Sequence, residues 1–256
     1  MFKNVIVKTP CKAISEGISS NPELGKPDYE KALVQHAAYI KALESCGVQV
    51  TVLPADEAFP DSCFVEDTAV LTERCAIISN PGAESRKGET AAMLPCIEQF
   101  YDKGAIEFIK APGTLEGGDV MMIGETLYVG LSARTNAEGI EQFSKILEKY
   151  GYKCVAVPLE KVLHLKTGVN YLGGRDLLVS GEFIDKSEFE SFNKITVPES
   201  EAYAANCIRV NSAVIAPEGY EGVKKAVEAA GYKVITVDTS EFRKIDGGLS
   251  CLSLRF

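Results

Sequence analysis

One cysteine near the C-terminus has the sequence context of a nucleophile. Cys251 follows the pair Gly247-Gly248 in GGLSCLSLRF, the stretch that ends the chain. Glycine lacks a Cβ and tolerates positive φ, so the backbone before the thiol can turn sharply or let a ligand come close. The alternation of Leu252 and Leu254 with polar residues predicts a half-buried strand that holds the thiol in place. Taken alone, the same residue fits a buried core cysteine better, because unpaired cysteine is among the most buried residue types.

The chain contains only two histidines that could serve as a general base. His36 lies within an apolar helical pattern, where packing is the more common role. His164 lies between two leucines and shortly before Gly168, where a strand passes into a loop. Catalytic groups are often placed on such loops. A satisfied core histidine is the equal alternative for His164.

Acidic residues gather directly before two apolar runs. Asp61, Glu66 and Asp67 precede the run 69–71, and Glu116 and Asp119 precede the run 120–122. A buried carboxylate is costly unless it is paired, so a cationic ligand is a candidate partner. The alternative is a solvated turn in which the acids act as caps.

Two arginines could bind the opposite charge. Arg86 and Arg134 each lie on a turn before an expected helix. A guanidinium in this position can bind a carboxylate through two parallel hydrogen bonds. Solvation at the surface is the alternative for both.

A pattern that recurs along the chain predicts the elements that must position these residues. A helix end, a glycine and a strand follow one another around Gly47, Gly151 and Gly231. Looser copies lie around Gly104 and around Ser191, which takes the place of the glycine. Five supersecondary units in one chain are the simplest interpretation.

The content of each unit predicts the fold class. Helical spacing predicts helices from Asp28 to Cys46 and, capped by Asn136, to Tyr150. Short apolar runs predict strands at 69–71, 75–78, 127–130, 176–179 and 213–216. ββαβ units that cannot bury their faces alone would close radially, so we expect a five-bladed α/β propeller as one domain over residues 1–256.

Composition limits the range of functions. The 256 residues are 46% hydrophobic and 25% charged, as is ordinary for a soluble globular protein. A net charge of −9 argues against nucleic acid as a partner and suits a small cationic substrate. No run approaches the roughly 18 apolar residues of a membrane span. We therefore expect neither a nucleic-acid nor a membrane partner.

Cysteine usage indicates the compartment. The eight cysteines include no C-x-x-C pair, so they fit neither a zinc site nor a compact disulfide framework. Charge interrupts residues 1–8 too early for the apolar core of a signal peptide. We expect a cytoplasmic protein with reduced thiols and no bound metal.

Five phrases resemble, in order, those of the dimethylarginine dimethylaminohydrolases, a family of the guanidino-group modifying enzymes or penteins. They are FVED at 64–67, EGGD at 116–119, SARTN at 132–136, LHLKTG at 163–168 and DGGLSC at 246–251. The resemblance runs nearly end to end. It implies a five-bladed α/β propeller, in agreement with the five units counted above. It also implies hydrolysis of an Nω-methylated L-arginine to L-citrulline and a methylamine, without metal or organic cofactor.

The resemblance implies roles at the reacting end of the substrate. Cys251 would be the nucleophile, which forms a covalent thiouronium intermediate, and His164 the general acid and base. Glu116 would orient the histidine and touch the guanidinium. Asp67 would hold the guanidinium nitrogens, with Glu66 beside it.

Further roles follow for the amino-acid end. Arg86 and Arg134 would bind the α-carboxylate, and Asp61 would lie near the α-amino group. Ile18 would belong to a lid, and the backbone carbonyl of Ile245 would face the substrate nitrogens.

Two other functions stay open at this point. An arginine deiminase has the same nucleophile with ammonia as the leaving group, although that family usually carries a helical insertion for which this chain has no room. A non-catalytic binding protein on the same scaffold, such as the ribosome anti-association factor, would not need Cys251, His164, Glu116 and Asp67 together. The sequence determines neither the methylation preference nor the oligomeric state, for which a homodimer is one option.

Overall fold

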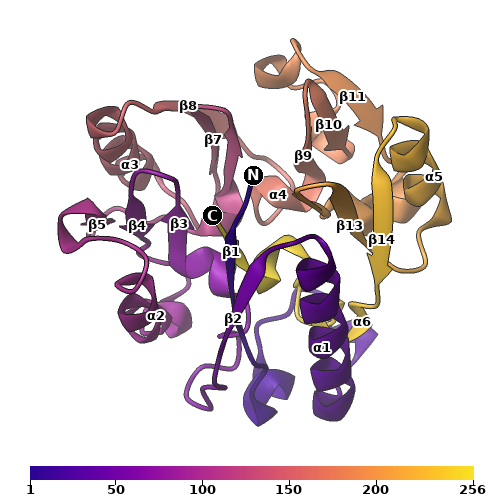
Figure 1. The fold of residues 1–256 in the computed structure, drawn as a ribbon, viewed down its shortest axis with the longest axis horizontal. Coiled ribbons are helices and arrows are strands. Elements are labelled where there is room, and N and C mark those ends of the chain that lie inside the picture. The colour runs from indigo at the N-terminus through magenta and orange to yellow at the C-terminus, as the bar shows by residue number, and fades with distance from the viewer. The chain divides into compact units, whose positions relative to one another are not determined.

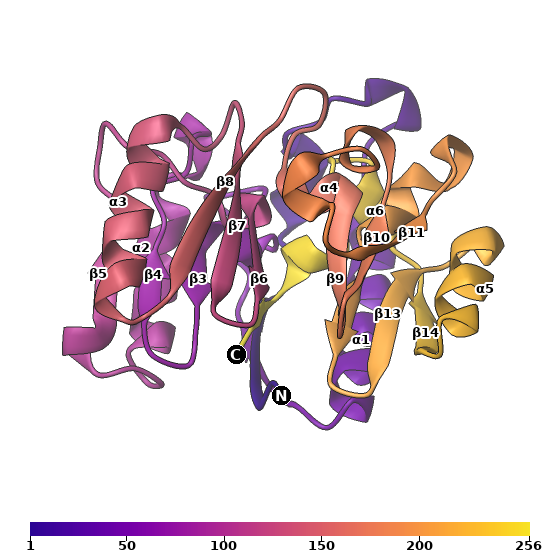
Figure 2. The same cartoon turned by 90° about the horizontal axis from the view of Figure 1, so that it is seen from above.

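The computed structural model describes every residue from 1 to 256. The strands form five three-stranded sheets (Figures 1 and 2). By proximity of Cα atoms the chain divides into two compact units. Unit 1 comprises residues 1–65 and 168–256, and unit 2 comprises residues 66–167. The expectation of a single domain stays a prediction.

All five sheets share one pattern, in which the middle strand has one antiparallel and one parallel neighbour. Unit 1 holds three sheets: β15 (Leu254–Arg255), β1 (Asn4–Lys8) and β2 (Gln49–Leu53); β9 (Val169–Gly173), β10 (Asp176–Val179) and β11 (Asn193–Thr196); β12 (Ile208–Val210), β13 (Ala213–Pro217) and β14 (Lys233–Val237). Unit 2 holds two: β3 (Ala69–Leu71), β4 (Ala76–Ile78) and β5 (Ile106–Phe108); β6 (Val120–Ile123), β7 (Thr126–Leu131) and β8 (Lys153–Pro158). The repeated pattern confirms the five units expected from the sequence.

Two long helices confirm the predicted spans. In α1 (Tyr29–Ser45) the side chain of Asp28 accepts a hydrogen bond from the backbone N of Lys31 at 2.8 Å. In α3 (Ala137–Lys149) the side chain of Asn136 accepts one from the backbone N of Gly139 at 2.8 Å. These caps satisfy N–H groups that the first helical turn leaves unpaired. Shorter helices are α2 (Glu89–Ile97), α4 (Leu165–Gly168), α5 (Glu221–Ala229) and α6 (Ser240–Arg243).

The helices supply one side of each hydrophobic core. α1 lies beside β2 and β14 in unit 1 (Figure 1), and Tyr39 and Leu43 on it are fully buried. In unit 2, α3 lies along β7 and β8 (Figure 2), and Phe143 and Leu147 pack with Leu127 of β7. Apolar residues at helical spacing therefore cover one face of a sheet.

Three of the predicted glycine caps have the backbone that only glycine adopts easily. Gly47, Gly151 and Gly231 have φ angles of 80°, 74° and 92°. Gly104, the looser copy, lies instead in a 3₁₀ turn over Lys103–Ala105. The copy at Ser191 differs further, because β10 and β11 are joined by 3₁₀ turns and not by an α-helix. The expected ββαβ order is therefore wrong for that sheet, because the predicted α-helix is absent.

The last strand of the chain completes the first sheet. β15 pairs antiparallel with β1, with Val5 opposite Arg255 and Ile6 opposite Leu254. The pairing ties both ends of the chain together within unit 1. It also fixes the segment just before β15, which contains Cys251.

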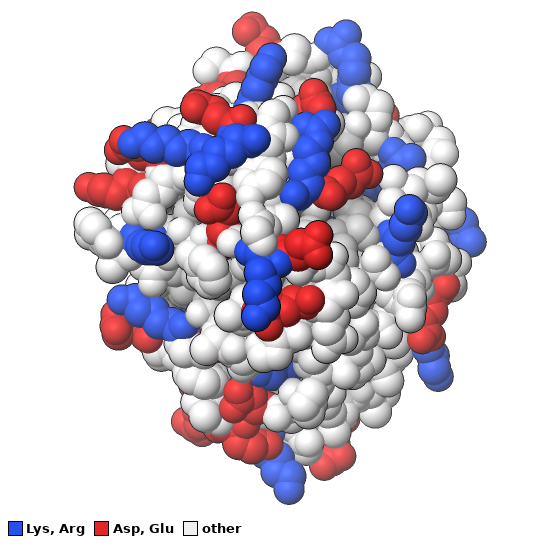
Figure 3. Space-filling view, turned by 60° about the vertical axis from the view of Figure 1, so that its left-hand side comes forward, with Lys and Arg blue, Asp and Glu red and all other residues white.

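The surface carries charges of both signs. On the face drawn in Figure 3, Lys and Arg side chains are interspersed with Asp and Glu side chains. Such a face offers no uniformly basic area for a polyanion. No helix has both the length and the apolar character to cross a membrane.

Candidate active site

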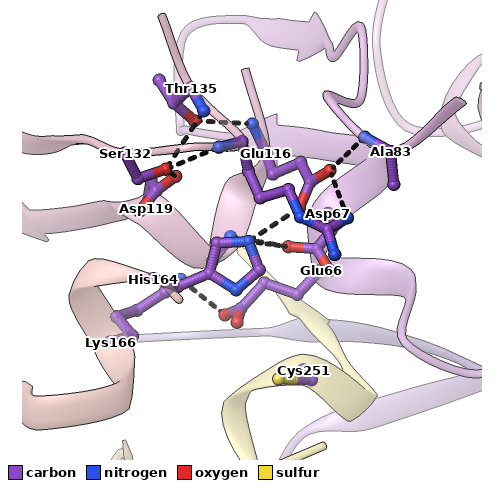
Figure 4. A network of polar contacts seen from close by, with 12 residues as sticks. Glu66, Asp67, Ala83, Glu116, Asp119, Ser132, Thr135, His164, Lys166 and Cys251 are labelled. Carbon is purple, nitrogen blue, oxygen red and sulfur yellow. Dashed lines mark hydrogen bonds and ion pairs between the residues drawn. The ribbon is translucent and has the colours of Figure 1, made fainter. Parts of the chain in front are cut away.

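The acidic candidates of unit 2 lie in one buried cluster around His164 (Figure 4). The buried carboxylates of this unit outnumber its buried cations. The carboxylates are Glu66, Asp67, Glu89, Glu116 and Asp119, and the cations are Arg86, His164 and Lys166. An excess of buried negative charge favours the entry of one more cation.

His164 and Glu116 form the centre of this cluster. The imidazole Nε2 lies 2.7 Å from Oε2 of Glu116, and the glutamate is fully buried. Burial alone would lower the pKa of His164, but Asp67, the hydrogen bond to Glu116 and Asp119 together raise it to about 9. Burial opposes ionisation of Glu116, yet the hydrogen bond and charge of His164 lower its pKa to about 2. The pair is therefore an imidazolium and a carboxylate at neutral pH.

Asp67 is held by a backbone that only glycine allows. Its Oδ1 accepts a hydrogen bond from the backbone N of Gly118 at 2.9 Å and lies 4.0 Å from Nε2 of His164. A Cβ at position 118 would lie 2.9 Å from both Oδ1 of Asp67 and Cγ of His164. A Cβ on Gly117 would lie 1.9 Å from the backbone O of Glu66. Both glycines of the EGGD phrase are thus required by close approach.

Arg86 is buried, so surface solvation, which was the alternative considered for it, is wrong. Its side chain is 6% exposed, and its Nη1 lies 2.5 Å from Oδ2 of Asp67. Its Nε and Nη2 bind the carboxylate of Glu89, at 3.0 Å from Oε1 and 2.8 Å from Oε2. Sequence reasoning missed Glu89, although its spacing three residues after Arg86 is typical of an ion pair. Binding of a substrate carboxylate by Arg86 stays a prediction.

Arg134 is the more accessible of the two arginines. Its side chain is 18% exposed, and Nη1 lies 3.5 Å from Oε1 of Glu116. The same Oε1 accepts a hydrogen bond from the backbone N of Ala83 at 3.1 Å. Arg134 therefore supports Glu116, and part of its side chain is exposed to solvent.

Lys166 is a second residue that sequence reasoning missed. Its Nζ lies 2.6 Å from Oε1 of Glu66, and both side chains are buried. The lysine lies in the LHLKTG phrase, two residues after His164, which was the available signal. It offsets the charge of Glu66 inside the cluster.

Cys251 lies in unit 1, on a 3₁₀ turn over Ser250–Leu252 and not on the expected strand. Strand geometry begins only at Leu254. The backbone N of Gly248 donates a hydrogen bond to Sγ at 3.5 Å, and a donor in this position stabilises negative charge on sulfur. The cysteine is partly exposed, unlike the core residue considered as an alternative.

The glycines before Cys251 serve close packing, while another residue carries the positive φ. A Cβ on Gly247 would lie 2.3 Å from the ring of Phe64, and one on Gly248 would lie 2.5 Å from Cγ of Asn206. Asp246 has a φ of 59°. Neither glycine has a positive φ, so the glycines do not make the sharp turn expected of them; they are needed because the packing leaves no room for a side chain.

The amide of Asn206 holds the cysteine turn from the other side. Its Oδ1 accepts a hydrogen bond from the backbone N of Ser250 at 2.9 Å, and its Nδ2 donates one to the Ser250 hydroxyl at 3.1 Å. Both residues are buried. No sequence signal had indicated this contact of Asn206.

The residues around Ile18, which the resemblance assigns to a lid, lie near Ile245 within unit 1. The backbone N of Ile18 donates a hydrogen bond to Oδ1 of Asp61 at 3.0 Å. A Cβ on the neighbouring Gly17 would lie 3.0 Å from that oxygen and 3.1 Å from Cδ1 of Ile245. The expected group of Ile18, Asp61 and Ile245 is therefore brought together.

Asp246 binds two residues that follow Ile18 in the chain. Its Oδ2 accepts a hydrogen bond from the backbone N of Ser20 at 2.6 Å. Its Oδ1 accepts hydrogen bonds from the Ser20 hydroxyl at 2.9 Å and from Nδ2 of Asn21 at 2.7 Å. This aspartate was not among the predicted site residues, although it opens the DGGLSC phrase.

His36 has the packing role that its helical context favoured. It is 3% exposed on α1, its Nε2 has no hydrogen-bond partner, and burial lowers its pKa to about 4. A neutral buried imidazole of this kind offers no accessible base. His164 is left as the candidate.

Comparison with known proteins decides the family. The family model described as N,N dimethylarginine dimethylhydrolase, eukaryotic, matches residues 23–252. A dimethylarginine dimethylaminohydrolase of Pseudomonas aeruginosa is 57% identical over 256 residues, which cover all of both chains. The chain belongs to the dimethylarginine dimethylaminohydrolase family.

Other members of the dimethylarginine dimethylaminohydrolase family support this assignment. One from Streptomyces coelicolor is 38% identical, and the match covers 99% of this chain and 96% of the relative. A solved structure of the Pseudomonas aeruginosa protein, a cysteine-to-serine variant in complex with citrulline, has a TM-score of 0.98 over all of both chains. This likeness and the five sheets confirm the predicted fold class, an α/β propeller.

Asp67, Glu116 and His164 each offer one potential metal-ligand atom. Ligand atoms of Asp67, Glu116 and His164 lie within 4.8 Å of one another. The same atoms are already joined by an imidazolium, so a metal ion would first have to displace its proton. As folded, the donor set fits an organic cation and a proton-transfer pair better than a metal.

Proposed function

We propose that the chain hydrolyses an Nω-methylated L-arginine to L-citrulline and methylamine or dimethylamine. The observation that carries this proposal is the excess of buried carboxylates around His164, which matches a cationic guanidinium. Membership of the family supplies the substrate class. The citrulline bound to the Pseudomonas aeruginosa relative is the product of such a reaction.

A guanidinium suits this cluster because it is planar and presents several N–H donors. Asp67 and Glu116 would accept from its nitrogens, with Glu66 beside them. Their charges would stabilise the substrate and the charge that moves over its nitrogens during the reaction. Arg86 and Lys166 neutralise part of the negative charge of the cluster through their ion pairs with Asp67 and Glu66.

The reaction would begin with attack of the Cys251 sulfur on the central carbon of the guanidinium. A thiolate is needed because the delocalised cation is a poor electrophile. The cationic substrate itself favours ionisation of a thiol within about 4 Å. The new C–S bond gives a tetrahedral adduct.

Collapse of that adduct would break the bond to the methylated nitrogen. His164 is charged at neutral pH and would donate its proton to the departing amine. A covalent thiouronium remains. The now neutral imidazole would take a proton from water, which attacks the same carbon and releases citrulline and the thiolate.

Further residues named by the family resemblance would bind the amino-acid end of the substrate. Arg134, helped by Arg86, would bind the α-carboxylate, and Asp61 would bind the α-amino group. Ile18 would cover the substrate as part of the lid, and the carbonyl of Ile245 would accept from a guanidinium nitrogen. Asp61 and Ile18 already meet through a hydrogen bond of 3.0 Å.

A product assay with a thiol variant tests the proposal. Purified protein is incubated with arginine, monomethylarginine and dimethylarginine, and citrulline, ammonia, methylamine and dimethylamine are measured. We expect alkylamine release from the methylated substrates, loss of turnover in Cys251→Ser, and a mass adduct on Cys251 in quenched wild-type reactions. Cys154→Ser is the matched control, because Cys154 is also partly exposed and burial raises its pKa to about 11.

Two results would reject the proposal. Turnover retained by Cys251→Ser would exclude this cysteine as the nucleophile. Ammonia from unmethylated arginine, without alkylamine from the methylated forms, would assign the deiminase reaction instead. Cytoplasmic location is part of the proposal and is supported by the thiol state of all eight cysteines.

A further inference from the structure

Asp119 is a fully buried carboxylate for which the proposed mechanism has no use. Its Oδ1 accepts a hydrogen bond from the backbone N of Leu165 at 3.0 Å, and its Oδ2 accepts one from the Ser132 hydroxyl at 2.7 Å. The Thr135 hydroxyl is a third donor. All three donors are neutral, and no lysine or arginine nitrogen lies within 4.0 Å. Burial raises the pKa of Asp119, and the charge of His164 together with these three hydrogen bonds opposes that rise.

Each of the three donors is also connected, through the chain or through a further hydrogen bond, to a residue of the predicted site; Figure 4 shows Ser132 and Thr135 beside Asp119. Leu165 directly follows His164 in the chain. The Thr135 hydroxyl also accepts a hydrogen bond from the backbone N of Glu116 at 3.1 Å. The Ser132 hydroxyl also accepts one from the backbone N of Arg134 at 3.0 Å.

The surroundings of Asp119 are shaped to fit this carboxylate closely. A Cβ on Gly130 would lie 2.6 Å from Oδ1 of Asp119, so the strand next to it must carry a glycine there. The Thr135 side chain is fully buried. Hydrogen bonds formed away from water with matched geometry hold their partners firmly.

We propose that Asp119 is a positioning residue, which fixes the backbones of His164 and Glu116 relative to each other and supports the charged imidazole. The inference rests on the proposed function. Hydrogen bonds through Leu165 and Thr135 connect Asp119 to the pair Glu116–His164. Asp119 thereby positions both His164, the proton donor, and Glu116, which orients it.

A neutral side chain at position 119 could not replace the negative charge with which Asp119 stabilises the imidazolium of His164. The charged groups that face His164 from unit 2 are Glu116, Asp67 and Asp119, and each of them favours the imidazolium. An asparagine could still accept from Leu165, but its NH₂ group would meet the Ser132 hydroxyl, which already accepts from two backbone N–H groups. An aspartate fits all three donors and adds the negative charge.

Two variants separate position from charge. Asp119→Asn removes the charge, and Ser132→Ala keeps the carboxylate but removes one of its donors. For Asp119→Asn we expect kcat to fall roughly tenfold and the alkaline limb of kcat/KM to move down by about one pH unit. For Ser132→Ala we expect kcat to fall severalfold while that limb stays in place.

NMR titration of the imidazoles gives a readout that does not depend on turnover. The chain has only two histidines, so a His36→Gln background leaves the His164 signal alone. We expect Asp119→Asn to lower the pKa of His164 and Ser132→Ala to leave it unchanged. If the wild type releases no alkylamine, the proposed function fails, yet this titration still decides the role of Asp119.

An unchanged His164 titration in folded Asp119→Asn would overturn the proposal. If that variant does not fold, Ser132→Ala and Thr135→Val carry the test in its place. The proposal then requires that both variants lose kcat with KM within twofold of wild type. Equal kcat values in the two variants and the wild type would overturn it.

Discussion

Substitution of Gly118 by alanine tests whether the close packing of Gly118 against Asp67 and His164 determines kcat. In Gly118→Ala the new Cβ would lie 2.9 Å from Oδ1 of Asp67, 2.9 Å from Cγ of His164 and 3.0 Å from its Nδ1. Ordinary contacts of a Cβ begin near 3.4 Å. The backbone angle of Gly118 is not in the left-handed region, so the substitution acts by contact alone.

The expected size follows from these distances. Relief of the contacts requires Asp67 and His164 to move by roughly 0.5 Å, since both are buried and cannot swing into solvent. A misplacement of about 1 Å can cost about a hundredfold in rate, so we expect kcat to fall roughly tenfold, or about 1.4 kcal/mol. Overpacking of this kind also costs about 1 to 3 kcal/mol of unfolding free energy.

Steady-state kinetics with dimethylarginine and urea unfolding measure the two effects. Gly104→Ala is the matched control, because no atom lies within 4 Å of a Cβ there and its φ is not positive. We expect the control to keep the kcat and stability of the wild type. A folded Gly118→Ala protein with kcat within twofold of wild type would refute the claim that these contacts position the site.

Three further predictions address pH, charge balance and the lid. We expect kcat/KM to fall with a midpoint near pH 9 as His164 loses its proton, and a profile flat to pH 10 would contradict this. Folding raises the pKa of His164 from 6.5 to about 9. The contribution of the Glu116–His164 pair to the free energy of unfolding is therefore complete below pH 6.5 and is lost as the pH rises through 9, which urea unfolding at several pH values can measure. Lys166→Met leaves Glu66 without its ammonium partner and should cost about 3 to 5 kcal/mol in urea unfolding, against near-neutral Lys145→Met at the surface. Asp246→Gly keeps the positive φ but removes the carboxylate that binds Ser20 and Asn21 of the proposed lid, and should raise KM severalfold and speed proteolysis within residues 18–25.

The last two predictions have clear opposing outcomes. A loss for Lys166→Met no larger than for the surface lysine would show that Glu66 is screened without it. In Asp246→Gly, unchanged KM together with unchanged proteolysis would show that the carboxylate does not hold the lid. Asp246→Asn, which retains an oxygen acceptor and tolerates positive φ, should lie between wild type and the glycine variant.

Local sequence signals predicted the parts of the fold that depend on neighbours in the chain. Asp28 and Asn136 begin their helices because a short polar side chain satisfies N–H groups two or three residues ahead. Gly47, Gly151 and Gly231 end helices because they adopt positive φ without strain. At Cys251 the alternation of apolar and polar residues predicted a strand, but the structure has a 3₁₀ turn, which follows the closely packed Gly247 and Gly248.

Caps, glycine turns and short phrases are encoded locally, so the five-unit pattern, the family and the identity of the chemical groups could be predicted from the sequence. Which charges neutralise one another depends on the folded backbone. Arg86 binds Asp67 and Glu89, Lys166 binds Glu66, and Asp119 reaches His164 through Leu165. Lys166 and Glu66 lie 100 residues apart in the chain, so no local pattern relates them. Their pairing arises because a buried charge without a partner is too costly, and the folded backbone alone determines which partner is within reach.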